Sequence, residues 1–276
     1  VNRQNILNET IDTIKKILKM PGIRKIPYKI KNEDDILTCI KNSSSQAIVP
    51  LFLISNVSGE GIDHLKSYLN FVPKRKVNIN TYMNDIEYHI DTIFFVTGVG
   101  TIVGGHLTSG TIRVGDKLVL GPNQTNGYDP FTVKSIHSKR VLVNEVRASG
   151  YVCICLRKAQ RKNIRKGQVL LSAHSPNHYS IREFKANVTI LKTHSTSIRV
   201  GYEPVLHVST IRQTAKIIHI DNIIYSKTRK DNKESILRTG DKATITFRFK
   251  YRNEYIKKGY KIVLAEGRVK LVGIVI

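Results

Sequence analysis

The chain has few cysteines, few acidic residues and no apolar run long enough to cross a bilayer. Its three cysteines, Cys39, Cys153 and Cys155, are an odd and sparse set without metal-site spacing, so we expect a reducing compartment, the cytoplasm, and no membrane partner. The 21 acidic residues are outnumbered by 45 lysines and arginines, which gives a net charge of +24. This charge predicts a polyanionic partner, usually nucleic acid; a solvated lysine-rich surface is the alternative.

Residues 1–75 have the pattern of part of an α/β domain. Apolar side chains recur at helical spacing over 5–20, Pro21-Gly22 should end that helix, and a second short helix is expected over 36–40. The apolar run 47–54 predicts a strand buried on both faces. A polar loop at 55–61 and a helix over 62–71, with Leu69 on its apolar face, follow. In a doubly wound domain such a loop lies where ligands bind.

From Glu87 onward the sequence predicts strand after strand, behind a polar linker at 73–84. One turn recurs: an apolar residue that should point inward, an arginine that should point outward, one further residue, and a glycine suited to positive φ. Its copies are Ile112-Arg113-Val114-Gly115, Ile164-Arg165-Lys166-Gly167, Ile198-Arg199-Val200-Gly201 and Leu237-Arg238-Thr239-Gly240. These turns indicate two barrels, 76–177 and 178–276.

Strands of the second barrel are expected over 184–192, 203–209, 212–220, 242–249 and 262–276, with a loop at 222–234. In the first barrel, Gly98 and Gly100 interrupt a β-branched and aromatic run. Glycines this close together predict a bulge or a close backbone approach. A phosphate-binding loop does not fit, because strand residues follow where a helix should begin.

No catalytic residue can be assigned. The sequence contains no G-x-x-x-x-G-K-[ST] loop and no intact Asn-Lys-x-Asp motif, so this chain alone should neither bind GTP well nor hydrolyse it. His174 and His178 have the spacing of zinc ligands on a helix, but Pro176 between them disfavours a metal site. Cys153 and Cys155 alternate in a strand pattern, which predicts two buried small residues on one face.

A dense basic cluster lies on a loop that leads into a strand. Phosphate binding and a solvated surface are both open for it. Its members are Arg157, Lys158, Arg161, Lys162, Arg165 and Lys166.

A glycine-rich strand pair leads into the turn Gly110-Thr111-Ile112-Arg113-Val114-Gly115-Asp116. With this turn, and with further segments in order over nearly the full length, the chain resembles the elongation factor Tu class of translational GTPases and, within it, the GTP-binding protein 1/2 subfamily. The further segments are Met20-Pro21-Gly22 with Arg24-Lys25-Ile26-Pro27, Ile54-Ser55-Asn56-Val57, Val133-Lys134-Ser135-Ile136-His137, Ile211-Arg212-Gln213-Thr214-Ala215, Leu237-Arg238-Thr239-Gly240-Asp241-Lys242-Ala243-Thr244 and Glu266-Gly267-Arg268.

The resemblance implies a fold: an α/β fragment that is the end of a P-loop GTPase G domain (1–75), then two all-β barrels, the translation-factor domains II and III. It implies GTP and Mg²⁺ as cofactors of a full-length GTPase parent, with Ser55, Asn56 and Val57 touching the guanine base. It also implies tRNA and the ribosome as partners. Asp91 and Phe94 match positions that bind the 3′-terminal adenosine and its aminoacyl group, and Thr92 stands where the family tends to have an acid. Arg212, Arg268 and Lys270 lie in segments that face the tRNA stem.

We therefore expect the C-terminal portion of a translational GTPase; a start at Val1 instead of Met indicates a fragment or a processed product. Two other functions stay open. One is a stand-alone RNA-binding module without nucleotide chemistry, and the other is a structural protein-interaction module whose charge serves solubility alone.

Overall fold

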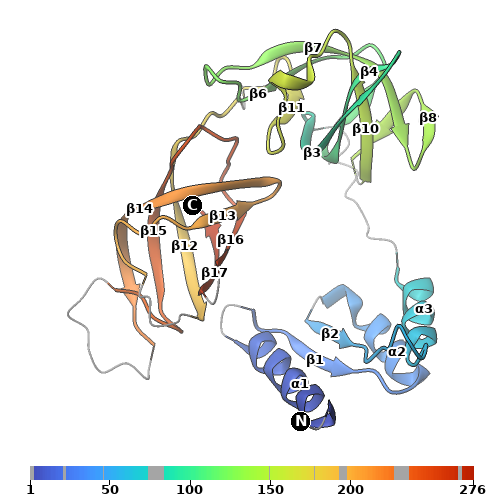
Figure 1. Ribbon diagram of the computed structural model, residues 1–276, viewed down its shortest axis with the longest axis vertical. Helices are drawn as coiled ribbons and strands as arrows, with labels where there is room; N and C mark the ends of the chain where they lie inside the picture. Colours follow the sequence, from blue (N-terminus) through green and yellow to red (C-terminus); the bar gives the residue numbers. More distant parts are fainter. Residues whose placement is uncertain are drawn as a thin grey trace. The chain divides into compact units, whose positions relative to one another are not determined.

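The computed structural model describes residues 3–20, 23–45, 47–73, 84–148, 150–176, 178–192, 198–226, 236–266 and 269–276. Pro21-Gly22, most of the expected linker and most of the expected loop at 222–234 lie outside these residues. The chain forms two compact units, 1–76 and 77–276, each described by itself. Figure 1 shows the α-helices gathered in the first unit and the long strands in the second. No helix in the described segments is long and apolar enough to span a membrane.

The first unit alternates helices and short strands: α1 (Arg3–Lys19), β1 (Ile26–Lys29), α2 (Glu33–Lys41), β2 (Ile48–Leu51) and α3 (Ile62–Phe71). β1 and β2 pair in parallel, with Ile26 opposite Ile48. α2 begins at a capping box, in which Asn32 Oδ1 accepts from Asp35 N (3.0 Å) and Asp35 Oδ2 from Asn32 N (3.3 Å). The three expected helices are thus present.

Two details of the first unit differ from expectation. β2 covers only four residues and is half-buried, not buried on both faces, because it belongs to a two-stranded sheet that leaves much of each strand uncovered. β1 was not expected, since four residues that include Pro27 give no alternation to detect. Leu69 is also 63% exposed and lies off the buried face of α3.

The first barrel closes in the order β10-β4-β3-β11-β6-β7, with β7 pairing back to β10. Its interior holds Tyr88, Ile90, Val103, Leu107 and Ile154, all fully buried. A seventh strand of the sheet, β8 (Val141–Val143), pairs with the end of β7, and β5 (Thr111–Arg113) pairs with β9 (Glu145–Arg147). The barrel strands are β3 (Glu87–Val96), β4 (Gly100–Ser109), β6 (Lys117–Gly121), β7 (Asp129–Ser138), β10 (Gly150–Leu156) and β11 (Val169–Ser172).

The second barrel closes in the order β12-β15-β14-β13-β16-β17. The prediction of two all-β barrels is therefore confirmed. The single strand expected over 262–276 is wrong, because β16 and β17 form an antiparallel hairpin with Lys261 opposite Ile274. Residues 222–224, expected in a loop, continue β14. The strands are β12 (Glu183–Lys192), β13 (Val205–Val208), β14 (Ile211–Ile224), β15 (Lys242–Phe249), β16 (Lys261–Glu266) and β17 (Val269–Val275).

The recurring turn has the predicted backbone in all four copies. Gly115, Gly167, Gly201 and Gly240 have φ between 90° and 95°. The residue after each glycine donates its N–H to the carbonyl of the arginine, at 3.1 to 3.4 Å. The leading residues Ile112, Ile164, Ile198 and Leu237 are buried. Three of the arginines are exposed as expected, but Arg165 is not, because it lies between the two barrels.

Gly98 and Gly100 serve a different purpose from the one expected. They form the turn between β3 and β4 with φ of 79° and 113°, and a Cβ at either position would meet nothing within 4 Å. The bulge lies deeper, where Ile90 pairs with Gly105 and Thr92 with Gly104. At Gly105 a Cβ would lie 2.0 Å from His89 O, so the close approach that a barrel corner needs occurs there.

Cys153 and Cys155 share one face of β10, as predicted, but it is the outer face. The inner face carries Val152, Ile154 and Leu156, which belong to the core cluster. Cys155 is nevertheless buried, and its thiol lies 3.6 Å from Val99 O. Cys153 is only half-buried, so the prediction of two buried cysteines is wrong for this one.

Candidate nucleic-acid interface

The loop expected to touch a nucleotide base joins β2 to α3. Ser55 organises it: its N–H donates to Glu60 O (3.0 Å), its carbonyl accepts from Gly59 N (2.9 Å) and its Oγ accepts from Ser58 N (3.1 Å). Asn56 and Val57 lie at the exposed tip. In the described part of the chain, neither of their backbone N–H groups meets an acceptor. The loop therefore offers donors that fit an acceptor such as guanine O6.

Asp91 and Phe94 lie on β3 but differ in availability. Asp91 is the bulged residue, without an opposite residue on β4, and its Oδ1 lies 2.6 Å from Lys166 Nζ. Phe94 lies beyond the bulge on the outer face, with 48% of its surface exposed. Asp91 is thus held in an ion pair, whereas the Phe94 ring is open to solvent.

The basic cluster divides into two groups. Arg157, Lys158, Arg161 and Lys162, called here the basic loop, are exposed, and none has an acidic group within 4 Å among the residues that the structure describes. Arg165 and Lys166 instead pair with Glu254 and Asp91. The surface available to phosphates is therefore the basic loop, not all six cations.

One hydrogen bond holds the basic loop beside the start of β4, and a second joins Val99 of the β3–β4 turn to Lys134 of β7. Thr101 Oγ1 donates to Ala159 O (2.7 Å), and Lys134 Nζ donates to Val99 O (2.7 Å). The turn exposes four large apolar side chains, called here the hairpin patch: Phe94, Phe95, Val96 and Val99, each 37% to 60% exposed. An apolar patch next to unpaired cations is typical of an interaction surface. Sequence reasoning found only Phe94 of the patch, since the bulge that turns β3 outward has no signal of its own.

The other expected contacts belong to the second barrel. Arg212 on β14 and Lys270 on β17 are exposed. Arg212 lies opposite His207 on β13, His207 lies opposite Val263 on β16, and β16 pairs with β17, so both cations lie on one run of four adjacent strands. Arg268 is outside the described residues. The structure thus places these cations in a group separate from the basic loop.

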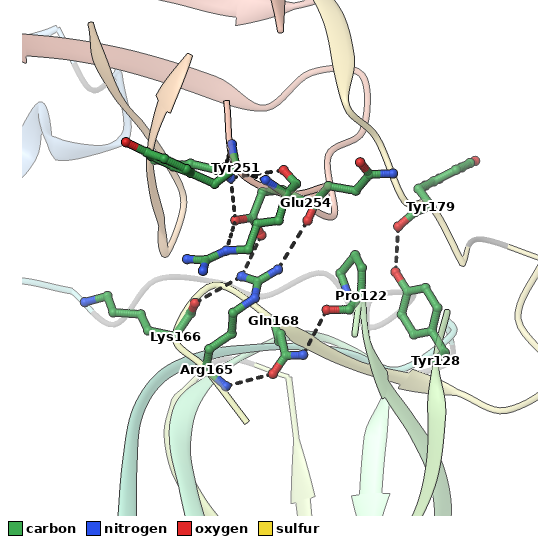
Figure 2. Close-up of polar contacts among 11 residues, drawn as sticks. Pro122, Tyr128, Arg165, Lys166, Gln168, Tyr179, Tyr251 and Glu254 are labelled. Atoms are coloured by element: carbon green, nitrogen blue, oxygen red, sulfur yellow. Dashed lines mark hydrogen bonds and ion pairs between the residues drawn. The ribbon is translucent and has the colours of Figure 1, made fainter. Parts of the chain in front are cut away.

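Arg165 connects the two barrels (Figure 2). Its Nη1 lies 2.7 Å from Glu254 Oε2, and its Nη2 donates to Asn253 O at 3.2 Å. Gln168 secures the turn beneath it, accepting from Arg165 N (2.8 Å) and donating to Pro122 O (2.9 Å). Glu254 is 1% exposed, and burial raises its pKa in spite of Arg165 and Arg252. Arg165 is therefore the main partner that the first barrel supplies to this buried carboxylate.

In a second contact, the first barrel supplies the carboxylate and the second barrel supplies its partners. Glu87 of the first barrel is buried and accepts from His89 Nε2 (2.9 Å) and from Tyr260 OH (2.6 Å), and it pairs with Lys257. Burial alone would raise the pKa of Glu87, but the bonds from His89, Lys257 and Tyr260 outweigh it and hold that pKa well below its usual range. Each barrel thus buries a carboxylate that has partners in the other barrel. Glu254 also accepts from Gln213 Nε2 (2.8 Å) and Arg252 Nε (3.3 Å) of its own barrel. Sequence reasoning missed both contacts, because the partners are 89 and 170 residues apart in the chain.

His178, the second of the two histidines with the spacing of zinc ligands, makes other contacts. Its ring stacks on Tyr128 with centroids 5.0 Å apart, and its Nε2 donates to Ser172 O at 3.1 Å. Within the described residues, no group of three metal-ligating side chains comes together.

Known proteins are similar to this chain over nearly its full length. The model of elongation factor Tu domain 2 matches residues 100–171, and that of the elongation factor Tu C-terminal domain matches residues 178–267. The chain is 39% identical to GTP-binding protein 1 of Xenopus laevis over 98% of its length, and 34% identical to GTP-binding protein 2 of Homo sapiens over 97%. It is 25% identical to elongation factor 1-alpha of Sulfolobus acidocaldarius over 94%. It covers 39%, 43% and 56% of these three relatives, respectively.

Proposed function

Because the chain belongs to the elongation factor Tu class of translational GTPases, we propose that its barrels bind tRNA and the ribosome, while the G domain of a longer parent binds and hydrolyses GTP. The observation that carries the proposal is the hairpin patch beside the basic loop. Phe94 offers an exposed ring, and four unpaired cations lie next to it on one barrel. Aromatic faces for bases and cations for phosphates are what single-stranded RNA ends require.

The nucleotide part of the proposal rests on the loop at Ser55. The free N–H groups of Asn56 and Val57 would contact the guanine base. Phosphates and Mg²⁺ would be held by a P-loop, which this sequence lacks, so they belong to the longer parent. We expect this chain alone to bind GTP poorly, and we place it in the cytoplasm, since all three cysteines are free thiols.

A salt series tests the RNA part. The 276-residue chain is titrated with fluorescent tRNA between about 50 and 200 mM salt, where phosphate contacts weaken steeply. Replacing all four residues of the basic loop by alanine should lower the affinity and reduce the slope of log affinity against log salt by roughly one unit per lost phosphate contact.

The matched control removes Arg113 and Arg147, which are exposed but already paired with Glu145. It should leave the salt slope nearly unchanged. Absence of binding at the lowest salt would reject the proposal and favour a protein-interaction module. Tight GTP binding by this chain alone would contradict the assignment of nucleotide chemistry to the missing part.

A further inference from the structure

The hairpin of β7 and β8 lies outside the closed part of the first barrel. β8 is the last strand of its sheet, and among the described strands only β7 pairs with it (Figure 1). Ser138 lies opposite Val141, so Lys139 and Arg140 alone make the turn. Both have positive φ, 51° and 68°. A two-residue turn of this kind prefers Asn-Gly, because glycine adopts positive φ without strain and asparagine tolerates it. The chain therefore keeps two cations at this turn although they strain its backbone.

The end of this hairpin, called here the β8 prong, comprises Lys139, Arg140, Val141 and Leu142. Val141 and Leu142 point to opposite faces of the strand, and each is 62% exposed. Both cations are exposed, and among the described residues no acidic group lies within 4 Å of either. Glu145, the acid nearest in sequence, is already paired with two arginines. Neither face of the prong is thus covered, and its charge is not neutralised.

The outer edge of β8 is also unpaired. Ser138 and Val141 flank a two-residue turn and form the hydrogen-bonded pair next to it, so the N–H and C=O of Leu142 point away from β7. Within the described part of the chain, neither group meets a backbone partner. The next outward carbonyl, that of Asn144, accepts from Val114 N at 3.0 Å, and Val114 is 42% exposed. The free edge is therefore short, with cations at one end and an aliphatic side chain at the other.

We propose that the β8 prong binds an acidic, extended segment of a partner protein, which adds to β8 as a further strand. Main-chain hydrogen bonds to Leu142 hold the segment, and its alternating side chains give specificity. Its aliphatic side chains cover Val141 and Leu142, and its carboxylates meet Lys139 and Arg140. The contact with these carboxylates is the reason for two cations at a turn that prefers Asn-Gly. This interaction is separate from the RNA surface of the proposed function and does not rest on it.

The order of charge and apolar surface along the prong favours a protein over a lipid bilayer or RNA. The cations lie at the tip and the aliphatic side chains behind them, so insertion into a bilayer would bury the charges deepest. RNA would leave Val141 and Leu142 against sugar and phosphate, and the prong offers no aromatic face to a base. A protein segment with both carboxylates and aliphatic side chains matches both kinds of surface.

A model peptide tests the proposal on the 276-residue chain. The probe is a fluorescein-labelled synthetic peptide of three glutamates followed by alternating valine and threonine, and its binding is measured by fluorescence anisotropy. Lys139→Asn/Arg140→Gly gives the turn its preferred residues and removes both cations. This variant should melt roughly 2 to 6 °C higher than wild type, because the strain is relieved. It should bind the peptide roughly two- to thirtyfold more weakly, for two lost ion pairs at a surface.

The matched control is Lys258→Ala/Lys261→Ala, which removes two exposed cations from the second barrel. It lowers the net charge by the same amount and should leave peptide binding nearly unchanged.

A second pair of variants tests the addition of a strand. The N–H of Leu142 takes no part in the ladder with β7, so Leu142→Pro should leave the hairpin folded and block the new strand. Leu142→Ala keeps the N–H and is its control. Leu142→Pro should abolish peptide binding, whereas Leu142→Ala should weaken it by roughly two- to tenfold for the lost apolar contact.

Several outcomes would overturn the proposal. They are equal peptide binding by wild type and Lys139→Asn/Arg140→Gly, an unchanged melting temperature in that variant, and equal binding by Leu142→Pro and Leu142→Ala. Wild type must also prefer the acidic peptide to one with lysines in place of the glutamates. If Lys139→Asn/Arg140→Gly loses more affinity for tRNA or for phosphatidylserine vesicles than the matched control does, the prong binds RNA or lipid instead. The salt series on the basic loop does not involve β8, so the proposed function is decided separately.

Discussion

Arg165 and Arg113 hold the same position in two copies of one turn, yet their side chains meet different surroundings. Arg113 is exposed and pairs with Glu145, whereas Arg165 is mostly covered and faces Glu254, which is 1% exposed. Arg165→Ala should therefore destabilise the fold by about 2 kcal/mol at pH 7, the cost of losing a charge-assisted bond to a buried carboxylate that keeps Arg252 and Gln213. Arg113→Ala should change stability little, because its pair is solvated. Urea unfolding of both variants measures the difference.

The loss of stability caused by Arg165→Ala should depend on pH. Burial already raises the pKa of Glu254, and loss of Arg165 should raise it further. As pH falls below that pKa, Glu254 becomes neutral and the penalty disappears, so the difference between wild type and Arg165→Ala should shrink from pH 7 to pH 5. A difference that stays constant would show that lost packing, not charge, accounts for it.

The pKa of Glu87 is shifted in the opposite direction from that of Glu254. Its pKa is held well below the usual range, so its ionised form stabilises the folded state at every pH above the unfolded value of about 4.3. This contribution declines as pH falls below that value. Glu87→Gln should cost about 2 kcal/mol at pH 7, in the range for hydrogen bonds to a charged group, and progressively less toward pH 3. Unfolding free energies of both proteins across this range are the measurement; equal losses at pH 7 and pH 3 would contradict it.

Among the strands, the β3–β4 hairpin contains glycines of two kinds. Gly98 needs a positive φ but has open space around it, whereas a Cβ at Gly105 would lie 2.0 Å from a backbone carbonyl oxygen that cannot give way easily. Gly98→Ala should cost about 1 kcal/mol for its backbone conformation alone. Gly105→Ala should cost about 3 kcal/mol or more, because the bulge must shift. Thermal melts of the two variants rank them, and equal melting temperatures would rule out the close approach as the reason for Gly105.

Local signals in the sequence determined most of these elements in advance. The turns that begin at Ile112, Ile164, Ile198 and Leu237 could be predicted, because each turn is formed by four adjacent residues and its glycine marks the position of positive φ. The bulge at Asp91 could not, since it depends on pairing with β4. Phe94 was found through resemblance, whereas Phe95, Val96 and Val99 were not, because their exposure depends on the turn by which β3 pairs with β4. What sequence reasoning missed lies between strands or between barrels.

At the scale of the whole molecule, the two barrels share their buried charge. Glu87 pairs with Lys257 and accepts from Tyr260, and Glu254 pairs with Arg165, so each barrel supplies partners to a carboxylate that the other buries. Within its own barrel Glu254 keeps Gln213 and Arg252, and Glu87 keeps His89, so the other barrel supplies only part of the compensation. Unfolding of one barrel should therefore leave a carboxylate of the other barrel without some of its partners. This loss couples the stabilities of the two barrels.

This coupling predicts how the second unit unfolds. In wild type, hydrogen exchange measured in peptides from β10 and from β15 should lose protection at the same urea concentration, as in one cooperative transition. The double variant Glu87→Gln/Arg165→Ala removes the charge on one side and the partner on the other, so the two peptides should lose protection at different concentrations. A core substitution that leaves the junction intact, Ile154→Ala, should shift both peptides together to lower urea, because Ile154 is fully buried in the first barrel. Coincident transitions in the double variant would mean that contacts other than these two carboxylates hold the barrels together.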